Sequence, residues 1–476
     1  MILIDRDLAE FAVNLATKNG ASYAEARLVK TGEEGYILKN GTPETVVFSE
    51  GEGLGIRVLA KGGMSFLALN KLSKDEIKTA IMKTIKMAKV SAKTLKEPIE
   101  LSEEKTVKAS WEVKPKINLS DISAKEKMDY LFEIEKSLKS IKNKLVSRVF
   151  QLETSEEEKY YVNSEGTRID SKIPRVMMYY SLVAIDGNDS EMRYFPIGES
   201  GGWEVIERWN LIKKINEESK VLLKIIKEGK RVPKEVQDIV LSPELVGIAM
   251  HESVGHPGEA DRPLGREAAQ AGETYATRDW MGRRIGSDFV NVVDDPLVKN
   301  SYGFYEYDDE GVKAQRRVLI QNGILNGYLH NRETAKIFGI KSNAAARASG
   351  FDREPLIRMS TTFFLPSNQT FAELIEEIKK GIFIKSYTEW NIDDKRWNEK
   401  YVGSEAYRIE NGELKELVRR PVLELTTQKF FSSVDGVGNK VEFISGSCGK
   451  GDPMSAIPVW MGGPHIRLRK INIGSA

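Results

Sequence analysis

The stretch Ile239-Val-Leu-Ser-Pro-Glu-Leu-Val-Gly-Ile-Ala-Met-His-Glu-Ser-Val-Gly-His-Pro-Gly-Glu-Ala-Asp261 predicts a buried strand that passes directly into a buried helix. The apolar run ends at Leu241, and Ser242 is a typical helix N-cap residue. Pro243 suits the first helical position, where no backbone donor is needed. A Pro-Gly pair that begins at Pro257 ends the helix. We therefore expect one strand–helix unit at the centre of the C-terminal part of the chain.

A histidine pair occupies the end of this predicted helix. The chain has only 4 histidines, and two of them, His251 and His256, lie five residues apart. On a regular helix such residues point about 140° apart, which is too wide for one shared metal ion. Gly255 would let the last turn loosen, widen to a π-type turn or unwind. The pair therefore holds a metal on a distorted helix end, or consists of two unrelated histidines.

A third metal ligand would come from elsewhere, because a catalytic zinc takes three protein ligands and a water. Cys448 is the only cysteine, and the glycines of Ser445-Gly-Ser-Cys-Gly-Lys-Gly-Asp452 predict a tight exposed loop around it. The alternative is that Cys448 is a small buried apolar residue. Glu259 and Asp261 are rival carboxylate ligands, unless they belong to a solvated acidic turn.

Four further polar residues are candidates of lower rank. Arg347 and Arg358 lie next to a predicted strand, where they would contact an oxyanion or a peptide backbone unless solvent surrounds them. His330 and His465 are expected to be surface or structural residues.

The composition excludes several classes of protein. Lys and Arg total 71 against 70 for Asp and Glu, so no excess of cations favours direct binding to nucleic acid. A hydrophobic fraction of 41% is enough for a packed core. No apolar run approaches the roughly 20 residues of a membrane span, and the first residues lack the pattern of a signal peptide. The single cysteine excludes an intramolecular disulfide. We therefore expect a cytoplasmic protein without membrane contact.

The fold class predicted from the order of elements is α+β, with two small α+β units followed by a larger strand-rich domain that carries the zinc-site helix. The predicted domains are residues 1–105, 106–228 and 229–476, and the charged segment 93–116 marks the first boundary. Asn40-Gly41 predicts a hairpin in the first unit. The other main predicted elements are strands at 145–152, 160–162, 176–185, 317–320, 357–365, 422–425 and 466–473, and helices near 77–88, 128–138 and 371–380.

Several motifs along the chain resemble those of the TldD/PmbA metalloprotease family. These are His-Glu-x-x-x-His at 251–256, Asp-Asp-Glu-Gly at 308–311, Leu-Ile-x-Asn-Gly-Ile-Leu-x-Gly-Tyr at 319–328, Cys-Gly-Lys at 448–450, Gly-x-Gly-Ile-Arg-Val at 53–58 and Gly-Ser-Glu-Ala-Tyr at 403–407. The chain is similar to the TldD branch, because the PmbA (TldE) branch lacks the His-Glu-x-x-x-His motif. One departure is Gly451-Asp452-Pro453, where the family often has a Gly-Gln pair.

This resemblance implies a zinc site made of His251, His256 and Cys448, with Glu252 as the general base. It implies a metallopeptidase that hydrolyses unfolded or extended peptides with a zinc-bound water. Glu259 or Asp261 would then contact a histidine ligand on the side away from the metal and so fix its orientation. The family also implies a dimer, either a homodimer or a heterodimer with a TldE/PmbA-like partner. Two other functions fit the same residues: a zinc amidase or deacylase on small substrates, and a non-catalytic regulatory or peptide-binding scaffold.

Overall fold

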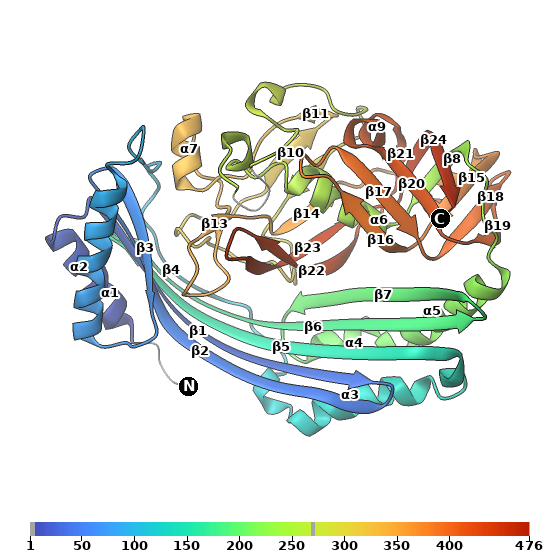
Figure 1. Cartoon of the computed structure of the whole chain (residues 1–476), viewed down its shortest axis with the longest axis horizontal. Helices are drawn as coiled ribbons and strands as arrows, with labels where there is room; N and C mark the ends of the chain where they lie inside the picture. Colours follow the sequence, from blue (N-terminus) through green and yellow to red (C-terminus); the bar gives the residue numbers. More distant parts are fainter. Residues whose placement is uncertain (1–4, 268–271, 476) are drawn as a thin grey trace.

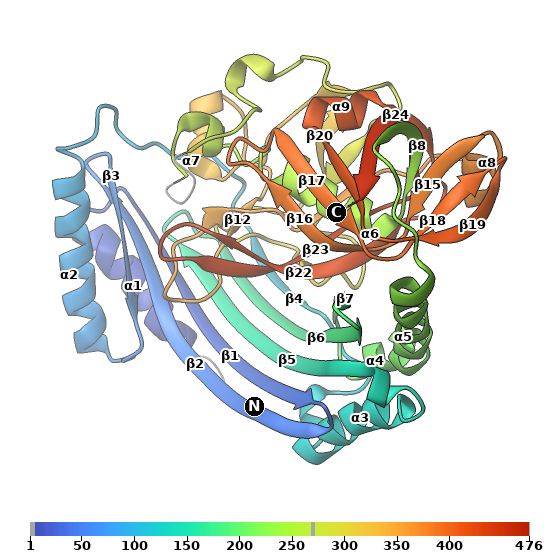
Figure 2. The ribbon, with the colours of Figure 1, turned by 45° about the vertical axis from the view of Figure 1, so that its right-hand side comes forward.

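A long curved sheet carries the first half of the chain, and the C-terminal half sits on its concave side (Figure 1). This arrangement is that of a computed structural model, which describes residues 5–267 and 272–475. Helices cover both ends of the sheet and leave its concave middle facing the C-terminal body (Figure 2). These helices are α1 (Arg6–Lys18) and α2 (Lys74–Ser91) at one end, and α3 (Ala124–Ser137), α4 (Glu204–Trp209) and α5 (Leu211–Glu228) at the other.

Seven strands form the curved sheet in the order β3-β2-β1-β5-β6, and β4 and β7 pair with successive parts of β6. Four of them are 17 to 19 residues long, which corresponds to roughly 55–65 Å of extended chain. The strands are β1 (Tyr23–Lys39), β2 (Thr42–Ala60), β3 (Gly63–Leu69), β4 (Lys108–Glu112), β5 (Leu145–Asn163), β6 (Arg168–Asp186) and β7 (Asp189–Ser200).

The hairpin predicted at Asn40-Gly41 is confirmed. Both residues have positive φ angles, 51° and 83°, as a two-residue type I′ turn requires. Strands β1 and β2 pair antiparallel from Tyr23 opposite Leu59 to the turn itself. A short local signal in the sequence thus sets the register of two long neighbouring strands.

The first two predicted units share this sheet. Strand β5 pairs with β1 from Asn163 opposite Glu25 to Val149 opposite Lys39. The prediction of separate strands at 145–152 and 160–162 is wrong, because the polar segment between them stays paired with both neighbouring strands. One of its side chains, Lys159, forms an ion pair with Asp309 of the C-terminal body. Strand β4 also lies inside the segment 93–116. We retain boundaries near 105 and 228 as a proposal for the folding units.

Two further sheets form the C-terminal body. The six-stranded sheet, in the order β11-β10-β9-β14-β23-β22, consists of β9 (Val292–Asp294), β10 (Arg317–Gln321), β11 (Ile324–Leu325), β14 (Thr361–Phe364), β22 (Glu442–Lys450) and β23 (Ser455–Gly463). The nine-stranded sheet consists of β8 (Glu235–Leu241), β15 (Lys380–Ile384), β16 (Tyr387–Ile392), β17 (Asn398–Gly403), β18 (Ala406–Glu410), β19 (Glu413–Val418), β20 (Pro421–Thr426), β21 (Val434–Val437) and β24 (Ile466–Ser475).

Smaller elements complete this body. They are a two-stranded ribbon of β12 (Ala346–Arg347) and β13 (Leu356–Ile357), and the helices α6 (Pro243–Met250), α7 (Arg332–Phe338), α8 (Phe371–Glu376) and α9 (Thr427–Ser432). The helix predicted over 371–380 is shorter than expected, because the chain enters strand β15 at Lys380. The α+β class and the strand-rich C-terminal part agree with the prediction.

The predicted strand–helix unit is confirmed, and it joins the two sheets of the C-terminal body. Strand β8 lies between β24 and β15 in the nine-stranded sheet. It leads into α6, which packs on strands β14, β22 and β23 of the six-stranded sheet. All residues of α6 except the half-buried Glu244 are buried, as expected for a helix that is apolar on nearly all sides. The end of this helix is therefore held on several sides.

Within the described ranges, no helix is both long enough and apolar enough to span a membrane.

Candidate metal centre

A π-helical turn follows α6 and brings the two histidines together. The turn spans His251–Gly255, and the backbone N–H of His256 donates to the carbonyl oxygen of His251 at 3.1 Å. This bond joins residues i and i+5, so the wider turn brings the two rings together edge to face, with centroids 4.8 Å apart. A Cβ at Gly255 would lie 1.9 Å from the Sδ atom of Met359, so only glycine fits there. Of the three distortions that the sequence allows, the structure therefore adopts the π-type turn.

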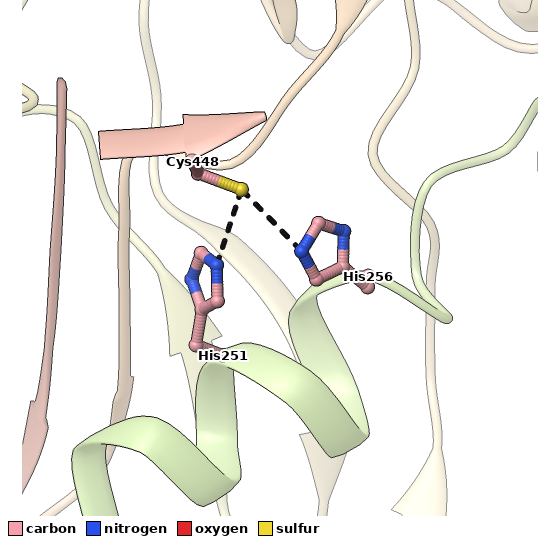
Figure 3. A group of neighbouring side chains, drawn as sticks. All are labelled: His251, His256 and Cys448. Atoms are coloured by element: carbon pink, nitrogen blue, oxygen red, sulfur yellow. Dashed lines mark hydrogen bonds between the residues drawn. The ribbon is translucent and has the colours of Figure 1, made fainter. Parts of the chain in front are cut away.

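Cys448 approaches the histidine pair from strand β22 (Figure 3). Its Sγ atom lies 3.2 Å from Nε2 of His251 and 3.3 Å from Nε2 of His256. All three side chains are buried, and their donor atoms lie within 4.8 Å of one another. The exposed loop predicted around Cys448 is wrong, because residues 442–450 pair with β23 and the chain turns only after Lys450.

The three donors fit a zinc ion. Two imidazole nitrogens and one thiolate are ligands that zinc prefers, and three of them leave a fourth position open. Burial raises the pKa of the Cys448 thiol, but His256 and the Arg358 guanidinium outweigh it and bring the pKa below its ordinary value. Burial lowers the pKa of His251. A neutral imidazole beside a thiolate is the protonation state that metal ligation needs.

A charged cluster lies behind His256. The Nδ1 atom of His256 is 3.3 Å from Oε2 of Glu259, so a proton on Nδ1 would leave Nε2 free to face Cys448. Arg262 donates to the same carboxylate oxygen at 3.0 Å, and Lys450 lies 3.2 Å from it. Burial would raise the pKa of Glu259, but Lys450, His256 and Arg262 hold it well below its ordinary value. Lys450 also donates to Asp261 at 2.8 Å.

The two carboxylates that were rival ligands therefore lie outside the group of converging donor atoms. In the part of the chain that the structure describes, that group consists of His251, His256 and Cys448. Glu259 contacts His256 from the side away from Cys448. Asp261 lies further from the histidines and forms an ion pair with Lys450.

Glu252 lies next to His251 on the π-helical turn and is buried. Its carboxylate forms an ion pair with Arg396, which comes from the loop between β16 and β17. Both residues line the same cleft as the three metal-ligand candidates. Sequence reasoning missed Arg396, because it lies 144 residues away in a charged stretch that has the composition of a solvated loop.

The two arginines predicted to contact substrate are both buried. Arg358 donates to the carbonyl oxygens of Cys448 and Ser455, so it fixes the backbone that carries the thiol. Arg347 donates to the carbonyl oxygens of Met359 at 2.7 Å and Pro458 at 2.9 Å. Burial lowers the pKa of Arg347 to about 10. Neither side chain lies in the solvent.

Of the other two histidines, His330 is buried and His465 is half-buried. Nδ1 of His330 lies 3.1 Å from the hydroxyl of Thr334, and His465 packs against Phe371 and Phe383. Burial lowers the pKa of both histidines to about 4. Both histidines pack against other side chains, which agrees with the expectation of surface or structural residues.

The metal-ligand candidates open onto a cleft of about 400 Å³. A second cavity of about 450 Å³ is lined on one side by residues of the long sheet, such as Glu153 and Lys159, and on the other by residues of the C-terminal body, such as Asp309 and Pro458. The two cavities share Tyr179 and Ser447 in their walls, so they adjoin each other. Half of the residues in the wall of the first cleft are aromatic or apolar, namely Tyr179, Tyr194, Pro196, Ile248, Tyr387, Trp390, Ile444, Val459 and Met461.

Three family models match nearly the whole chain. Residues 24–92 match domain 1, residues 117–224 the central domain and residues 234–475 the C-terminal domain of the PmbA/TldA metallopeptidases. A metalloprotease of Methanocaldococcus jannaschii is 34% identical over 94% of this chain and 95% of its own. A zinc metalloprotease TldD homolog of Saccharolobus solfataricus is 25% identical over 97% of this chain and 98% of its own.

Solved structures share the fold. TldE from Thermococcus kodakarensis aligns with a TM-score of 0.74 and 18% identity over 98% of this chain and 100% of that chain. A Thermotoga maritima protein, described as a candidate modulator of a DNA gyrase, aligns with a TM-score of 0.78 and 18% identity over 98% and 99%. At this identity the likeness establishes the architecture alone.

Proposed function

The chain belongs to the PmbA/TldA metallopeptidase family, and we propose that it is a zinc-dependent peptidase that hydrolyses unfolded or extended peptides. The observation that carries this proposal is the convergence of two imidazole nitrogens and one sulfur at the wall of a cleft, with Glu252 beside them. Relatives described as metalloproteases, one of them as a zinc metalloprotease, support it.

The proposed metal ligands are His251, His256 and Cys448. When bound, zinc would supply a Lewis acid that polarises the peptide carbonyl and lowers the pKa of water. The chain contributes a fixed ligand geometry, because Glu259 orients His256 and Arg358 holds the backbone of Cys448. These contacts support a site whose ligands are already in place before the metal binds.

Glu252 is the proposed general base. It follows His251 directly, it lines the cleft, and Arg396 holds its carboxylate in one position. A carboxylate at this place would take a proton from the attacking water and pass it to the leaving amine. Apolar and aromatic side chains line part of the cleft, which strengthens the electrostatic contacts beside them.

Strand β22 offers a place for an extended peptide. It is the last strand in the order of its sheet, and residues Ser445 to Gly449 line the cleft. A substrate backbone that paired with this edge would lie next to Cys448 and would be bound with little dependence on sequence. This supports a peptidase that acts on unfolded chains.

The proposed assembly is a dimer, either with a second copy or with a TldE/PmbA-like partner, in the cytoplasm. The family resemblance motivates this proposal. The mass of the purified chain, measured by light scattering alone and with a TldE-like partner, tests it.

The first experiment is zinc analysis of the wild-type protein and of its Cys448→Ala variant. We expect about one zinc per chain in the wild type and a clear loss in the variant. Undiminished zinc in the variant would exclude Cys448 as a ligand. The second experiment compares peptides of increasing length with small amides, and faster cleavage of the peptides is expected. Zinc-loaded protein that cleaves small amides only would favour the amidase alternative.

A further inference from the structure

We propose that Arg396 is a further catalytic residue, which stabilises the negative charge that develops on the carbonyl oxygen of the substrate. The proposal rests on the peptidase function proposed above for the same cleft. It starts from a buried guanidinium group that lies beside the proposed general base and faces the cleft.

The loop that carries Arg396 is braced at both ends. Asp393 accepts hydrogen bonds from the backbone N–H of Trp397 at 2.7 Å and from the amide of Asn398 at 2.6 Å. Thr427 donates to the carbonyl oxygen of Arg396 at 2.7 Å. The ring of Trp397 packs 5.5 Å from that of Trp280. The loop therefore presents its arginine in a fixed place.

The backbone of Arg396 has a φ angle of 61°, in the left-handed region that disfavours residues with a Cβ atom. Such a conformation persists only where its surroundings fix it, and it is found often at functional sites. Glycine would fit this backbone without strain. The sequence nevertheless places a long, charged side chain here.

The guanidinium group has donors to spare. It carries five N–H bonds, and its contact with Glu252 uses Nη1. Its Nε atom is buried and has no hydrogen-bond partner among the described residues. The whole residue is only 6% exposed, and it lines the cleft together with His251 and Cys448. A buried cation with free donors at this position points to an oxyanion as its second partner.

The reaction creates such an oxyanion. When a water oxygen attacks the carbonyl carbon, a C–O bond forms, the carbonyl π electrons move to the carbonyl oxygen, and Glu252 takes a proton from the water. When the C–N bond breaks, the electron pair on oxygen re-forms the carbonyl group. The nitrogen keeps the bonding pair and receives the proton from Glu252. Donors aimed at the oxygen are most useful between these two steps.

The test compares two substitutions of this residue with a control. Arg396→Gly removes the guanidinium and suits the backbone angle, whereas Arg396→Lys keeps the charge. Arg467→Gln is the matched control, because Arg467 is a buried arginine paired with a carboxylate, Asp435, and does not line the cleft. Zinc content and Tm are measured for each variant. The readouts are kcat, KM and the affinity for a phosphinic peptide, whose tetrahedral anionic group mimics the oxyanion.

We expect Arg396→Gly to retain zinc and to lower kcat about 100-fold or more, with KM changed by less than about threefold. Affinity for the phosphinic peptide should fall by a similar factor, and it should fall in the Glu252→Gln background as well. Arg396→Lys should lose less activity than Arg396→Gly. Guanidinium ions at millimolar concentration should restore part of the kcat of Arg396→Gly. The control should keep wild-type activity.

Unchanged affinity for the phosphinic peptide in Arg396→Gly would overturn the proposal, because the residue would then act only by positioning Glu252. An equal loss of kcat in the control would overturn it as well. If the zinc-loaded wild type cleaves no peptide, the proposed function fails first. Cleavage by the wild type, combined with unchanged inhibitor affinity in the variant, overturns the role of Arg396 alone.

Discussion

Behind His256 the chain packs a buried carboxylate, Glu259, with the cations Arg262 and Lys450, whereas Nδ1 of His251 has no hydrogen-bond partner within residues 5–267 and 272–475. We call the first group the holding side of the metal centre. The cleft side, next to His251, consists of Glu252 and Arg396. On the holding side, Glu259 forms ion pairs with Arg262 and Lys450. On the cleft side, Nδ1 of His251 and Nε of Arg396 have no hydrogen-bond partner among the described residues.

This difference suggests that the holding side positions a metal ligand and that the cleft side contacts the substrate. Three partners outweigh the effect of burial on Glu259, so that carboxylate stays ionised and keeps one imidazole in place. On the cleft side, a carboxylate and a guanidinium share one described contact and border about 400 Å³ of space. Groups that must exchange partners with a substrate need that freedom. Replacing one carboxylate at a time by its amide tests whether the two sides have these different roles.

The largest effect is expected from Glu252→Gln. Loss of the general base should lower kcat by about 100- to 10,000-fold, while the zinc content stays at the wild-type value. The measurement is steady-state peptide hydrolysis together with metal analysis. Glu244→Gln is the matched control, because Glu244 lies on the preceding helix, pairs with Arg193 at 2.7 Å and does not line the cleft. Full activity of Glu252→Gln with zinc bound would contradict the assignment.

On the holding side, Glu259→Gln should weaken zinc binding by about 10- to 100-fold, because His256 loses the partner that fixes its proton. Activity should return when zinc is added in excess, unlike in Glu252→Gln. Competition with a chelator measures the affinity. Asp261→Asn is the control, since Asp261 contacts Lys450 but not the imidazole. Equal losses in both variants would remove the distinction between Glu259 and its neighbours.

The contrast between the two sides also separates what the sequence predicts from what it does not. The strand, the helix and the histidine pair come from one stretch of 23 residues, and N-cap, proline and spacing signals within it were enough to predict them. Arg396 joins the site only through the path of a distant loop, so no local pattern marks it. The sequence identifies Cys448 as a ligand candidate, but the glycines around it indicate a loop where the structure has strand β22.

The π-helical turn connects both sides, and Gly255→Ala should disturb them together. The added methyl group would lie 1.9 Å from Sδ of Met359 and 3.3 Å from the hydroxyl of Thr362. Overpacking of this kind costs about 1–3 kcal/mol of the free energy of unfolding. Thermal unfolding measures it, and Gly255→Ala should cost less stability in a Met359→Ala background than in the wild type. Gly35→Ala serves as the control, because a Cβ there meets no atom within 4 Å.

The smallest effect concerns a second carboxylate near the cleft side. Glu399 accepts a hydrogen bond from Ser253 of the π-helical turn at 2.6 Å. Burial raises its pKa to about 7 from an ordinary value of 4.5, although Ser253, Thr427 and Tyr401 donate to it and act in the opposite direction. A carboxyl group whose pKa is higher in the folded state stabilises the fold fully below about pH 4.5. That contribution is lost as the pH rises through 7.

The Tm of the wild type should therefore fall between pH 5 and pH 8 by more than the Tm of Glu399→Gln, with a difference on the order of 2 °C. Glutamine keeps the neutral side chain at both values, so its curve removes the contribution of this one group. Glu405→Gln is a suitable control, because Glu405 is also a buried carboxylate but pairs with Lys385. Parallel curves for the wild type and Glu399→Gln would mean that Glu399 is ionised throughout. An ionised Glu399 would place a negative charge beside the π-helical turn that carries Glu252, and the charge of Arg396 would then help to neutralise it as well as bind an oxyanion.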